Sequence, residues 1–180
     1  MHFERSDLAG LVLVTPERLS DERGYFTRTF CAEEFAREGL VRAFPQASLS
    51  YNATRGTVRG MHFQVAPHGE TKLVRCARGA IYDVVVDLRQ GEPTYRQWRG
   101  FELTAQNGLA LYIPDGFAHG FQTLTDESEI AYAITPPFVP GAGSGVRHND
   151  PAIAVRWPLP VGAIADKDRA WPLLADASRP

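Results

Sequence analysis

Short apolar stretches, separated by turn residues, follow one another along almost the whole chain. They cover residues 11–14, 25–30, 46–52, 57–64, 72–77, 80–88, 95–103, 109–113, 119–124, 129–135 and 153–157. The run Ile81-Tyr82-Asp83-Val84-Val85-Val86 is nearly continuous and β-branched, which is typical of a buried central strand. Residues 72–77 and 80–88 predict a hairpin that turns at Arg78-Gly79. The one clear helical pattern covers residues 32–39 and ends at Gly39.

This series of short segments predicts an all-β barrel or jelly roll with a short helix near its front. With 180 residues and no linker pattern, the chain is expected to form a single domain over residues 1–180 with a sizeable core. No apolar run approaches the roughly 20 residues that span a bilayer. Residues 1–10 also lack the apolar centre of a signal peptide. We therefore expect a cytoplasmic protein that does not contact a membrane.

Charge and cysteine content narrow the classes of function further. The formal net charge is −2, so the chain lacks the excess of basic residues that is typical of nucleic-acid binding. The two cysteines, Cys31 and Cys76, are too few for a disulfide framework. Free thiols in a reducing cytoplasm are the simpler interpretation.

Glycine, proline and histidine spacing resembles the two motifs of cupins, which are barrels around a central pocket. The matching positions are Gly56, His62, Gly79, Gly108, Pro114, Gly116 and His119. Two positions differ in a way that changes the chemistry. Gln64 stands where a metal-binding cupin has its second histidine, and Lys72 stands where it has a carboxylate. Because an ammonium group repels a divalent cation, we expect a metal-free, cationic pocket suited to an anionic substrate or to developing negative charge.

Several side chains in these motifs could carry acid–base chemistry. His62 is a candidate general base, since the ordinary pKa of imidazole is near neutral. A carboxylate on its other ring nitrogen would orient it, and Asp83 and Asp168 are both candidates. Lys72 could stabilise an enolate or bind phosphate. Tyr132 alternates with apolar neighbours, so it is either a core tyrosine or a phenol that donates a proton across the pocket from His62.

Arg23 and Arg59 each precede a glycine, which leaves room for a bulky ligand, although either one could equally be a surface charge. His119 follows a Pro-x-Gly turn and could bind phosphate or a sugar hydroxyl. A base, a phenolic acid and a cation are the groups needed to remove a proton next to a ketone and to return it. If base and acid lie on opposite faces of the carbon, its configuration inverts without a redox cofactor.

In these motifs the chain resembles the dTDP-4-dehydrorhamnose 3,5-epimerase family, and the resemblance covers nearly its whole length. The resemblance rests on residues 21–24, 58–64, 72–75, 79–89, 113–121, 149–151 and 166–168. It implies a cupin jelly-roll β-barrel with a few short helices, assembled as a homodimer with exchanged N-terminal strands. It also implies a dTDP-linked sugar substrate, conversion of dTDP-4-dehydro-6-deoxy-D-glucose to dTDP-4-dehydro-L-rhamnose, and no cofactor or metal.

The resemblance also assigns roles to individual residues. It implies that His62 is the base, that Asp168 is its partner, that Tyr132 is the acid and that Lys72 lies near the carbonyl oxygen of the sugar. It implies that the remaining substrate-binding residues are Arg23, Gln46, Arg59, His119, Lys167 and Phe138.

One departure from the family leaves the number of inverted centres open. The family has a second pocket tyrosine six residues after the acid, and this chain has Phe138 there. A 3-only or 5-only epimerase of a deoxysugar pathway is therefore an alternative. A sugar ketoisomerase and a non-catalytic sugar-nucleotide-binding cupin are further alternatives, although the latter would not need Tyr132 and Asp168. Gln64 and Lys72 make a metal-dependent oxygenase the least favoured reading.

Overall fold

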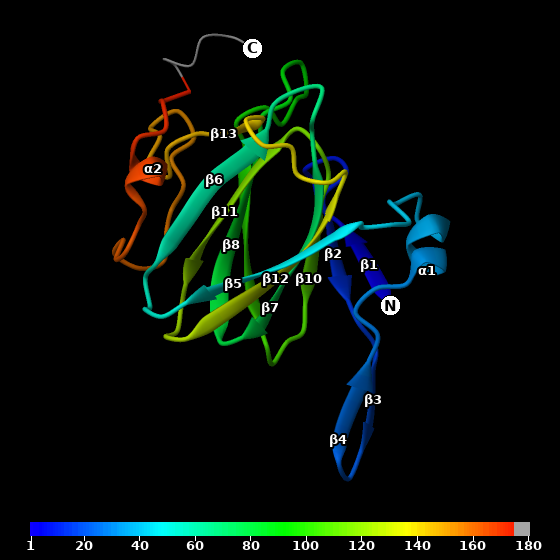
Figure 1. Cartoon of the computed structure of the whole chain (residues 1–180). Coiled ribbons are helices and arrows are strands. Elements are labelled where there is room, and N and C mark those ends of the chain that lie inside the picture. The colour runs from blue at the N-terminus through cyan, green and yellow to red at the C-terminus, as the bar shows by residue number, and fades with distance from the viewer. Residues whose placement is uncertain (175–180) are drawn as a thin grey trace.

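Two antiparallel sheets face each other and form a jelly roll, as the segment pattern predicted (Figure 1). The structure is a computed structural model that describes residues 1–174, so residues 175–180 of the predicted domain lie outside the described part. The six-stranded sheet has the order β1-β2-β10-β7-β12-β5. Its strands are β1 (His2–Arg5), β2 (Val12–Thr15), β10 (Ala110–Ile113), β7 (Thr71–Arg78), β12 (Ser128–Thr135) and β5 (Gln46–Asn52).

The second sheet has five strands in the order β13-β6-β11-β8-β9. Its strands are β13 (Gly143–Gly145), β6 (Val58–Gln64), β11 (Phe117–Thr123), β8 (Ala80–Asp87) and β9 (Trp98–Thr104). The two strands predicted on either side of Arg78-Gly79 are confirmed as β7 and β8, but the hairpin itself is wrong. The two strands belong to different sheets and do not pair with each other, because the chain crosses between the sheets at this turn. Gly79 has a φ of +75°, a conformation that glycine adopts without strain.

Burial explains the uninterrupted apolar run of β8. Ile81 and Val85 face the other sheet and join the central core with residues such as Val74 and Leu111. Val84 on the opposite face is covered by residues from the C-terminal third of the chain, namely Val146, Ile153, Val155, Trp157 and Leu174. Since neither face of β8 meets water, apolar residues occupy nearly every position.

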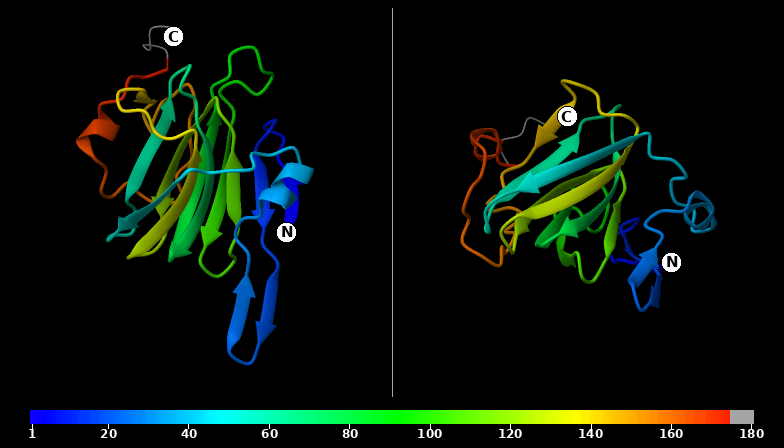
Figure 2. Two further views of the ribbon diagram at one scale, coloured as in Figure 1. Left: turned by 45° about the vertical axis from the view of Figure 1, so that its right-hand side comes forward. Right: turned by 60° about the horizontal axis from the view of Figure 1, so that its bottom comes forward.

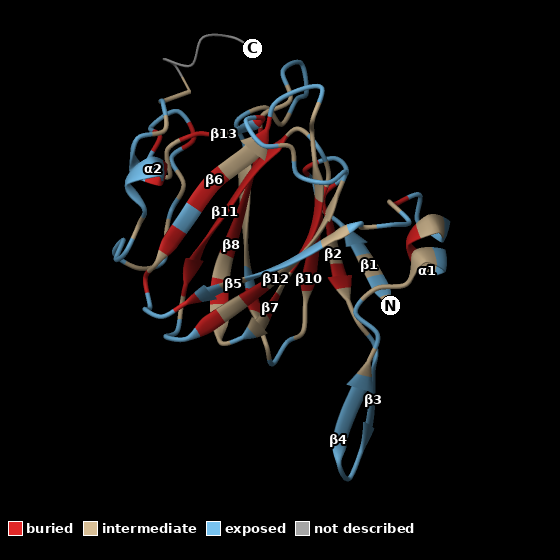
Figure 3. Ribbon diagram, in the orientation of Figure 1, coloured by how far each residue is buried: buried red, intermediate tan, exposed pale blue. Residues whose placement is uncertain are grey.

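The N-terminal region adds two elements beside the sandwich. Helix α1 (Ala32–Arg37) buries Phe35, whose ring meets those of Phe3 and Phe30 at centroid distances of 5.3 and 4.9 Å. A separate hairpin, β3 (Arg18–Asp21) and β4 (Gly24–Thr27), projects from the body of the protein (Figures 1 and 2). The hairpin is exposed along its length (Figure 3).

Most of the predicted segments are confirmed, and the helix over residues 32–39 corresponds to α1. The strand expected over residues 153–157 is wrong. The carboxylate of Asp150 accepts the backbone N–H of Ala152, and Ala154 has a φ of +55°, so this stretch is a turn followed by irregular chain. The segment pattern missed β1, β3 and β13, which have four, four and three residues, and the short helix α2 (Asp166–Arg169).

Within residues 1–174, neither helix is long and apolar enough to cross a membrane.

Candidate active site

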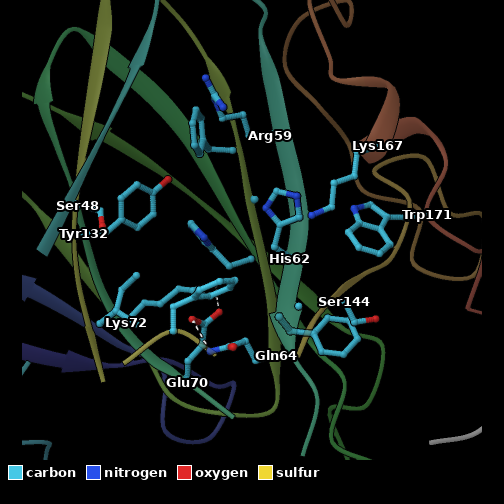
Figure 4. Close-up of a pocket in the computed structure, with 17 residues that line it drawn as sticks. Ser48, Arg59, His62, Gln64, Glu70, Lys72, Tyr132, Ser144, Lys167 and Trp171 are labelled. Carbon is cyan, nitrogen blue, oxygen red and sulfur yellow. Dashed lines mark hydrogen bonds and ion pairs between the residues drawn. The ribbon is translucent and has the colours of Figure 1, made fainter. Parts of the chain in front are cut away.

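A cavity of about 340 Å³ lies between the two sheets, and side chains from both sheets and from the C-terminal segment line it (Figure 4). It brings together seven of the predicted site residues, Arg59, His62, Lys72, His119, Tyr132, Phe138 and Lys167. Asp168 lies directly behind His62. The predicted pocket is thus present, and most of the predicted residues converge on it.

His62 and Asp168 form a hydrogen-bonded pair on one wall of the cavity. The Nε2 atom of His62 lies 2.7 Å from Oδ1 of Asp168, although 106 residues separate them in sequence. Asp168 also accepts the backbone N–H of Gly60 at 3.1 Å and the indole N–H of Trp171 at 3.3 Å. Because one nitrogen of His62 is bound to the carboxylate, the other can take a proton from a bound substrate.

The electrostatics of Asp168 favour its charged form. Burial acts to raise the pKa of this carboxyl, but the hydrogen bonds from His62 and from the Gly60 N–H outweigh it, so the pKa lies below its ordinary value. An anion at this position orients the imidazole and stabilises the imidazolium that forms when His62 takes up a proton.

Two glycines let the backbone pack closely around this pair. Gly60 has a φ of +129°, and a Cβ on it would lie 2.6 Å from the Cα of Gly120 on the neighbouring strand. Gly145 on β13 lies under the ring of Trp171, where a Cβ would come within 2.5 Å of the indole. These two glycines allow β6, β11 and Trp171 to approach one another around Asp168.

His119 belongs to a second histidine–carboxylate pair. It lies opposite His62 in the register of β6 and β11, and its Nε2 is 2.8 Å from Oδ2 of Asp83 on β8. Both side chains of this second pair are buried. The choice between Asp83 and Asp168 that the sequence left open is therefore resolved by the topology, since Asp83 pairs with His119 and Asp168 pairs with His62.

Tyr132 enters the cavity from β12, on the sheet opposite to β6 (Figure 4). Its ring packs edge-on against His119 with a centroid distance of 6.1 Å. Burial and the negative charge of Asp83 raise the pKa of its phenol, while the charge of Arg59 acts in the opposite direction. The group is therefore a protonated donor that faces His62 across the cavity.

Two further cations lie at the rim on the His62 side. The guanidinium of Arg59 is held by the side-chain oxygen of Asn52 at 2.6 Å and by the carbonyl of Tyr51 at 3.3 Å. Lys167 on α2 lies over the ring of Trp171, with its Nζ 5.3 Å from the ring centroid. Together with Lys72 they give the cavity the positive character that the sequence predicted.

Lys72 is paired with a residue that the sequence analysis missed. Its Nζ lies 2.8 Å from Oε1 of Glu70, and Oε2 of Glu70 accepts a hydrogen bond of 3.3 Å from Nε2 of Gln64 (Figure 4). Glu70 precedes β7 by one residue, in a loop where a glutamate gives no signal of its own in the sequence. Its spacing of two from Lys72 is the one feature that could have suggested a contact.

Trp171 is the other residue that the sequence analysis missed. It contacts both members of the first pair, since its ring centroid is 6.3 Å from that of His62 and its N–H reaches Asp168. A single tryptophan three residues after Asp168, near the end of the chain, carries no motif that would have marked it.

Two of the predicted substrate-binding residues lie at different places. Gln46 does not line the cavity, but its Oε1 accepts the backbone N–H of Phe138 at 2.6 Å and so helps to place that lining residue. Arg23 lies at the tip of the β3–β4 hairpin with its side chain 85% exposed, outside the cavity of its own chain. Its guanidinium contacts Asp21 across the turn.

Within residues 1–174, no three histidine, cysteine, aspartate or glutamate side chains come together as they would around a metal ion. Two of the cupin metal-ligand positions are held by Gln64 and Lys72, and both side chains contact Glu70 instead.

Comparison with known proteins identifies the family. The sequence profile described as dTDP-4-dehydrorhamnose 3,5-epimerase matches residues 5–176. The chain belongs to this epimerase family. A dTDP-4-dehydrorhamnose 3,5-epimerase of Sinorhizobium fredii is 40% identical over 98% of this chain and 91% of its own length. A protein of Streptomyces niveus named dTDP-4-dehydrorhamnose 3-epimerase is 39% identical over 98% of this chain and 86% of its own length.

A solved structure supports the same assignment. The dTDP-4-dehydrorhamnose 3,5-epimerase of Bacillus anthracis, determined with TDP and pyrophosphate bound, superimposes with a TM-score of 0.93 at 40% identity. The match covers 96% of this chain and 99% of that one. The resemblance read from the sequence, the cupin jelly-roll fold and the isomerase class are thereby confirmed.

Proposed function

We propose that this epimerase converts dTDP-4-dehydro-6-deoxy-D-glucose to dTDP-4-dehydro-L-rhamnose by inverting the carbons on both sides of the ketone. One observation carries the proposal: the His62–Asp168 pair and the protonated Tyr132 face each other across a single cavity, from different sheets. A sugar bound between them exposes one face to a base and the other face to an acid. Inversion needs this arrangement, whereas binding alone does not.

Each inversion balances without a metal or a redox cofactor. His62 takes the proton from the carbon next to the ketone, and the electron pair of that C–H bond moves into an enolate. Lys72 stabilises the negative charge on the enolate oxygen. Tyr132 then gives its phenolic proton to the opposite face of the carbon, and the two side chains return to their starting states by proton exchange with solvent. The same two groups serve both carbons when the ring shifts between them.

The nucleotide part of the substrate is assigned from charge and from the bound TDP of the Bacillus anthracis relative. Arg59 and Lys167 lie at the rim, where a diphosphate attached to the sugar would pass. His119 contributes a ring nitrogen for a sugar hydroxyl or a phosphate oxygen. These residues together favour a dianionic nucleotide sugar over a neutral sugar.

The enzyme is proposed to act as a homodimer in which the β3–β4 hairpins are exchanged. Leu19 and Phe26 are paired across this hairpin, and they are 62% and 68% exposed. Two such apolar side chains on a projecting hairpin favour a second protein surface. Placed against the partner subunit, the hairpin would bring Arg23 to the partner's cavity. We also infer a cytoplasmic location, since both cysteines are free thiols.

A 3-only epimerase is the second candidate, and Phe138 is the observation that favours it. Its ring lines the cavity without a hydroxyl group, and the relative from Streptomyces niveus is named as a 3-epimerase. Proton NMR in deuterium oxide with dTDP-4-dehydro-6-deoxy-D-glucose distinguishes the two. Deuterium at both C3 and C5, with formation of the L-rhamno product, supports double inversion, and deuterium at C3 alone supports the second candidate. No exchange at either carbon contradicts both.

A further inference from the structure

The described residues that line the cavity include one carboxylate, that of Glu70, among several cations. The side chains of Glu70 and Lys72 are only 9% and 10% exposed, so the pair is largely removed from water. In a site for a dianionic substrate, a negative charge weakens binding through repulsion. Taking both charges out of water also has a desolvation cost. An acidic residue here is therefore expected to contribute something other than substrate affinity.

The contacts of Glu70 join the two sheets at the floor of the cavity. One carboxylate oxygen is 2.8 Å from Nζ of Lys72 at the start of β7, in the six-stranded sheet. The other accepts the amide of Gln64 at the end of β6, in the five-stranded sheet. The oxygen of the same amide accepts the backbone N–H of Val139 at 3.0 Å. This last bond fixes which end of the Gln64 amide faces Glu70, because only the oxygen can accept the N–H.

Lys72 needs such a support for the role proposed above. Its backbone is fixed in the sheet, where it lies in register with Ile113 and Ile134 on the two neighbouring strands. The ammonium itself is at the end of four rotatable bonds, which allow many positions. A cation stabilises an enolate most effectively when it already lies where the negative charge will develop. The ammonium has three N–H donors, so a bond to Glu70 leaves two for the substrate.

We propose that Glu70 is a positioning residue that holds the Lys72 ammonium at the site of the enolate oxygen, and that Gln64 holds Glu70 in turn. The inference rests on the proposed epimerase reaction. Glu70 does not touch the reacting atoms, and it acts through Lys72. In the variant Glu70→Gln, the amide has only one acceptor oxygen for the two donors. If its NH2 faces the ammonium, Lys72 loses its acceptor; if its oxygen faces the ammonium, Lys72 keeps only a neutral acceptor and residue 70 loses the bond from Gln64.

A double-mutant cycle of deuterium exchange at the carbon next to the ketone tests this role. Glu70→Gln should lower the exchange rate by about 10- to 100-fold, the scale of a misplacement of about 1 Å. The affinity for TDP should stay the same or improve, because a negative charge has been removed. In a Lys72→Met background the same change should have no further effect, since two groups that act as a unit are not additive. Glu70→Asp, which keeps the charge, should recover part of the rate.

Glu102→Gln on the exposed face of β9 is the matched control, and it should exchange at the wild-type rate. The thermal midpoints of all variants show whether they are folded. The proposal would be overturned if Glu70→Gln lowered the exchange rate by the same factor in the wild-type and Lys72→Met backgrounds. It would also be overturned if Glu70→Gln exchanged at the wild-type rate.

A crystal structure of Glu70→Gln gives a readout that does not depend on activity. The Lys72 ammonium should move by about 1 Å or more from its place beside residue 70. An unmoved ammonium would also overturn the proposal. Absence of exchange in the wild-type enzyme would instead contradict the proposed function, and the crystal structure would still decide whether Glu70 positions Lys72.

Discussion

His62 enters the cavity with one ring nitrogen already bound to Asp168, and Asp168 is itself held by Gly60 and Trp171. This support means that the proposed base is oriented before substrate arrives. On the opposite sheet, Tyr132 has a pKa raised by burial, so it stays protonated at neutral pH. The two groups therefore differ in the direction in which each can move a proton, and this difference gives rise to two residue-level predictions.

Replacing the base should abolish exchange without unfolding the protein. His62→Ala should lower deuterium incorporation next to the ketone by about 10²- to 10⁴-fold, the usual contribution of a positioned base. Asp168→Asn should also lower it, because the imidazole loses the anion that orients it. Asp166→Asn, an exposed carboxylate on the same short helix, is the control and should retain the wild-type rate. Wild-type exchange in His62→Ala would show that another group is the base.

Removing the acid should have a different signature. In Tyr132→Phe, His62 can still form the enolate and can return the proton to the face from which it came. Exchange should therefore fall less than net inversion, and NMR in deuterium oxide measures both quantities in one sample. An equal loss of the two would exclude Tyr132 as the opposite-face donor.

Phe138 is predicted to influence the second inversion. Phe138→Tyr should raise the share of doubly inverted product, because a hydroxyl at this position adds a polar contact to the sugar ring. Product ratios followed at C3 and C5 in wild type and variant measure the effect. An unchanged ratio would exclude Phe138 as the determinant.

The sequence located the cavity residues of the cupin motifs but gave no signal for two residues that contact them, Glu70 and Trp171. His62, His119 and Lys72 were found from their spacing to glycines and prolines, which marks strand ends and turns. Glu70 and Trp171 reach the site through side-chain contacts whose partners are set by the fold. The pairing of Asp83 with His119 likewise depends on the register of β8 and β11.

At the scale of elements, the projecting β3–β4 hairpin is the feature that a single chain does not explain. The segment predicted over residues 25–30 overlaps β4, whereas no segment was predicted over β3. Strand β3 has a single apolar residue, Leu19, which is too few to show a pattern. Strands β1 and β13 were missed for the same reason. The long strands β5, β6, β8 and β12 were found because each has at least seven residues, which is enough to show its pattern.

Exchange of the hairpin predicts complementation between two inactive variants. A heterodimer of an Arg23→Ala chain and a His62→Ala chain should contain one intact site, made of an unaltered barrel and an unaltered hairpin. It should recover about half of the wild-type activity per dimer, because a two-fold dimer has two equivalent sites. Two different affinity tags allow the heterodimer to be purified, and a heterodimer of two His62→Ala chains is the control. No recovery above the Arg23→Ala homodimer would place Arg23 outside the partner's site.

For the whole molecule, buried carboxylates predict how stability depends on pH. Asp87 is fully buried, and it accepts hydrogen bonds from Arg89 at 2.7 and 2.9 Å and from Thr94 at 2.6 Å. Burial acts to raise the pKa of this carboxyl, but these bonds outweigh it and the pKa falls below its ordinary value of 3.8. A depressed pKa in the folded state contributes stability that is complete above 3.8 and is lost as the pH falls through the folded-state value.

Urea unfolding at neutral and acidic pH checks this. The free energy of unfolding should fall as the pH is lowered from about 4 toward the folded-state pKa of Asp87. Asp87→Asn should cost about 2 kcal/mol at neutral pH and should reduce the dependence on acid. A variant with wild-type stability at pH 7 would show that this network does not stabilise the fold.

The projecting hairpin also has a consequence for genetics. If the hairpins are exchanged as proposed, each working site draws on two copies of the gene product, so lesions combine differently according to which chain carries them. A chain that carries both a hairpin lesion and a barrel lesion spoils both sites of any dimer it enters. The same two lesions on separate chains leave one site of their heterodimer intact. In a cell that also expresses the wild-type allele, an allele that carries both lesions would therefore be more dominant than an allele that carries one. The distribution of the two mutations between alleles would matter as much as their identity.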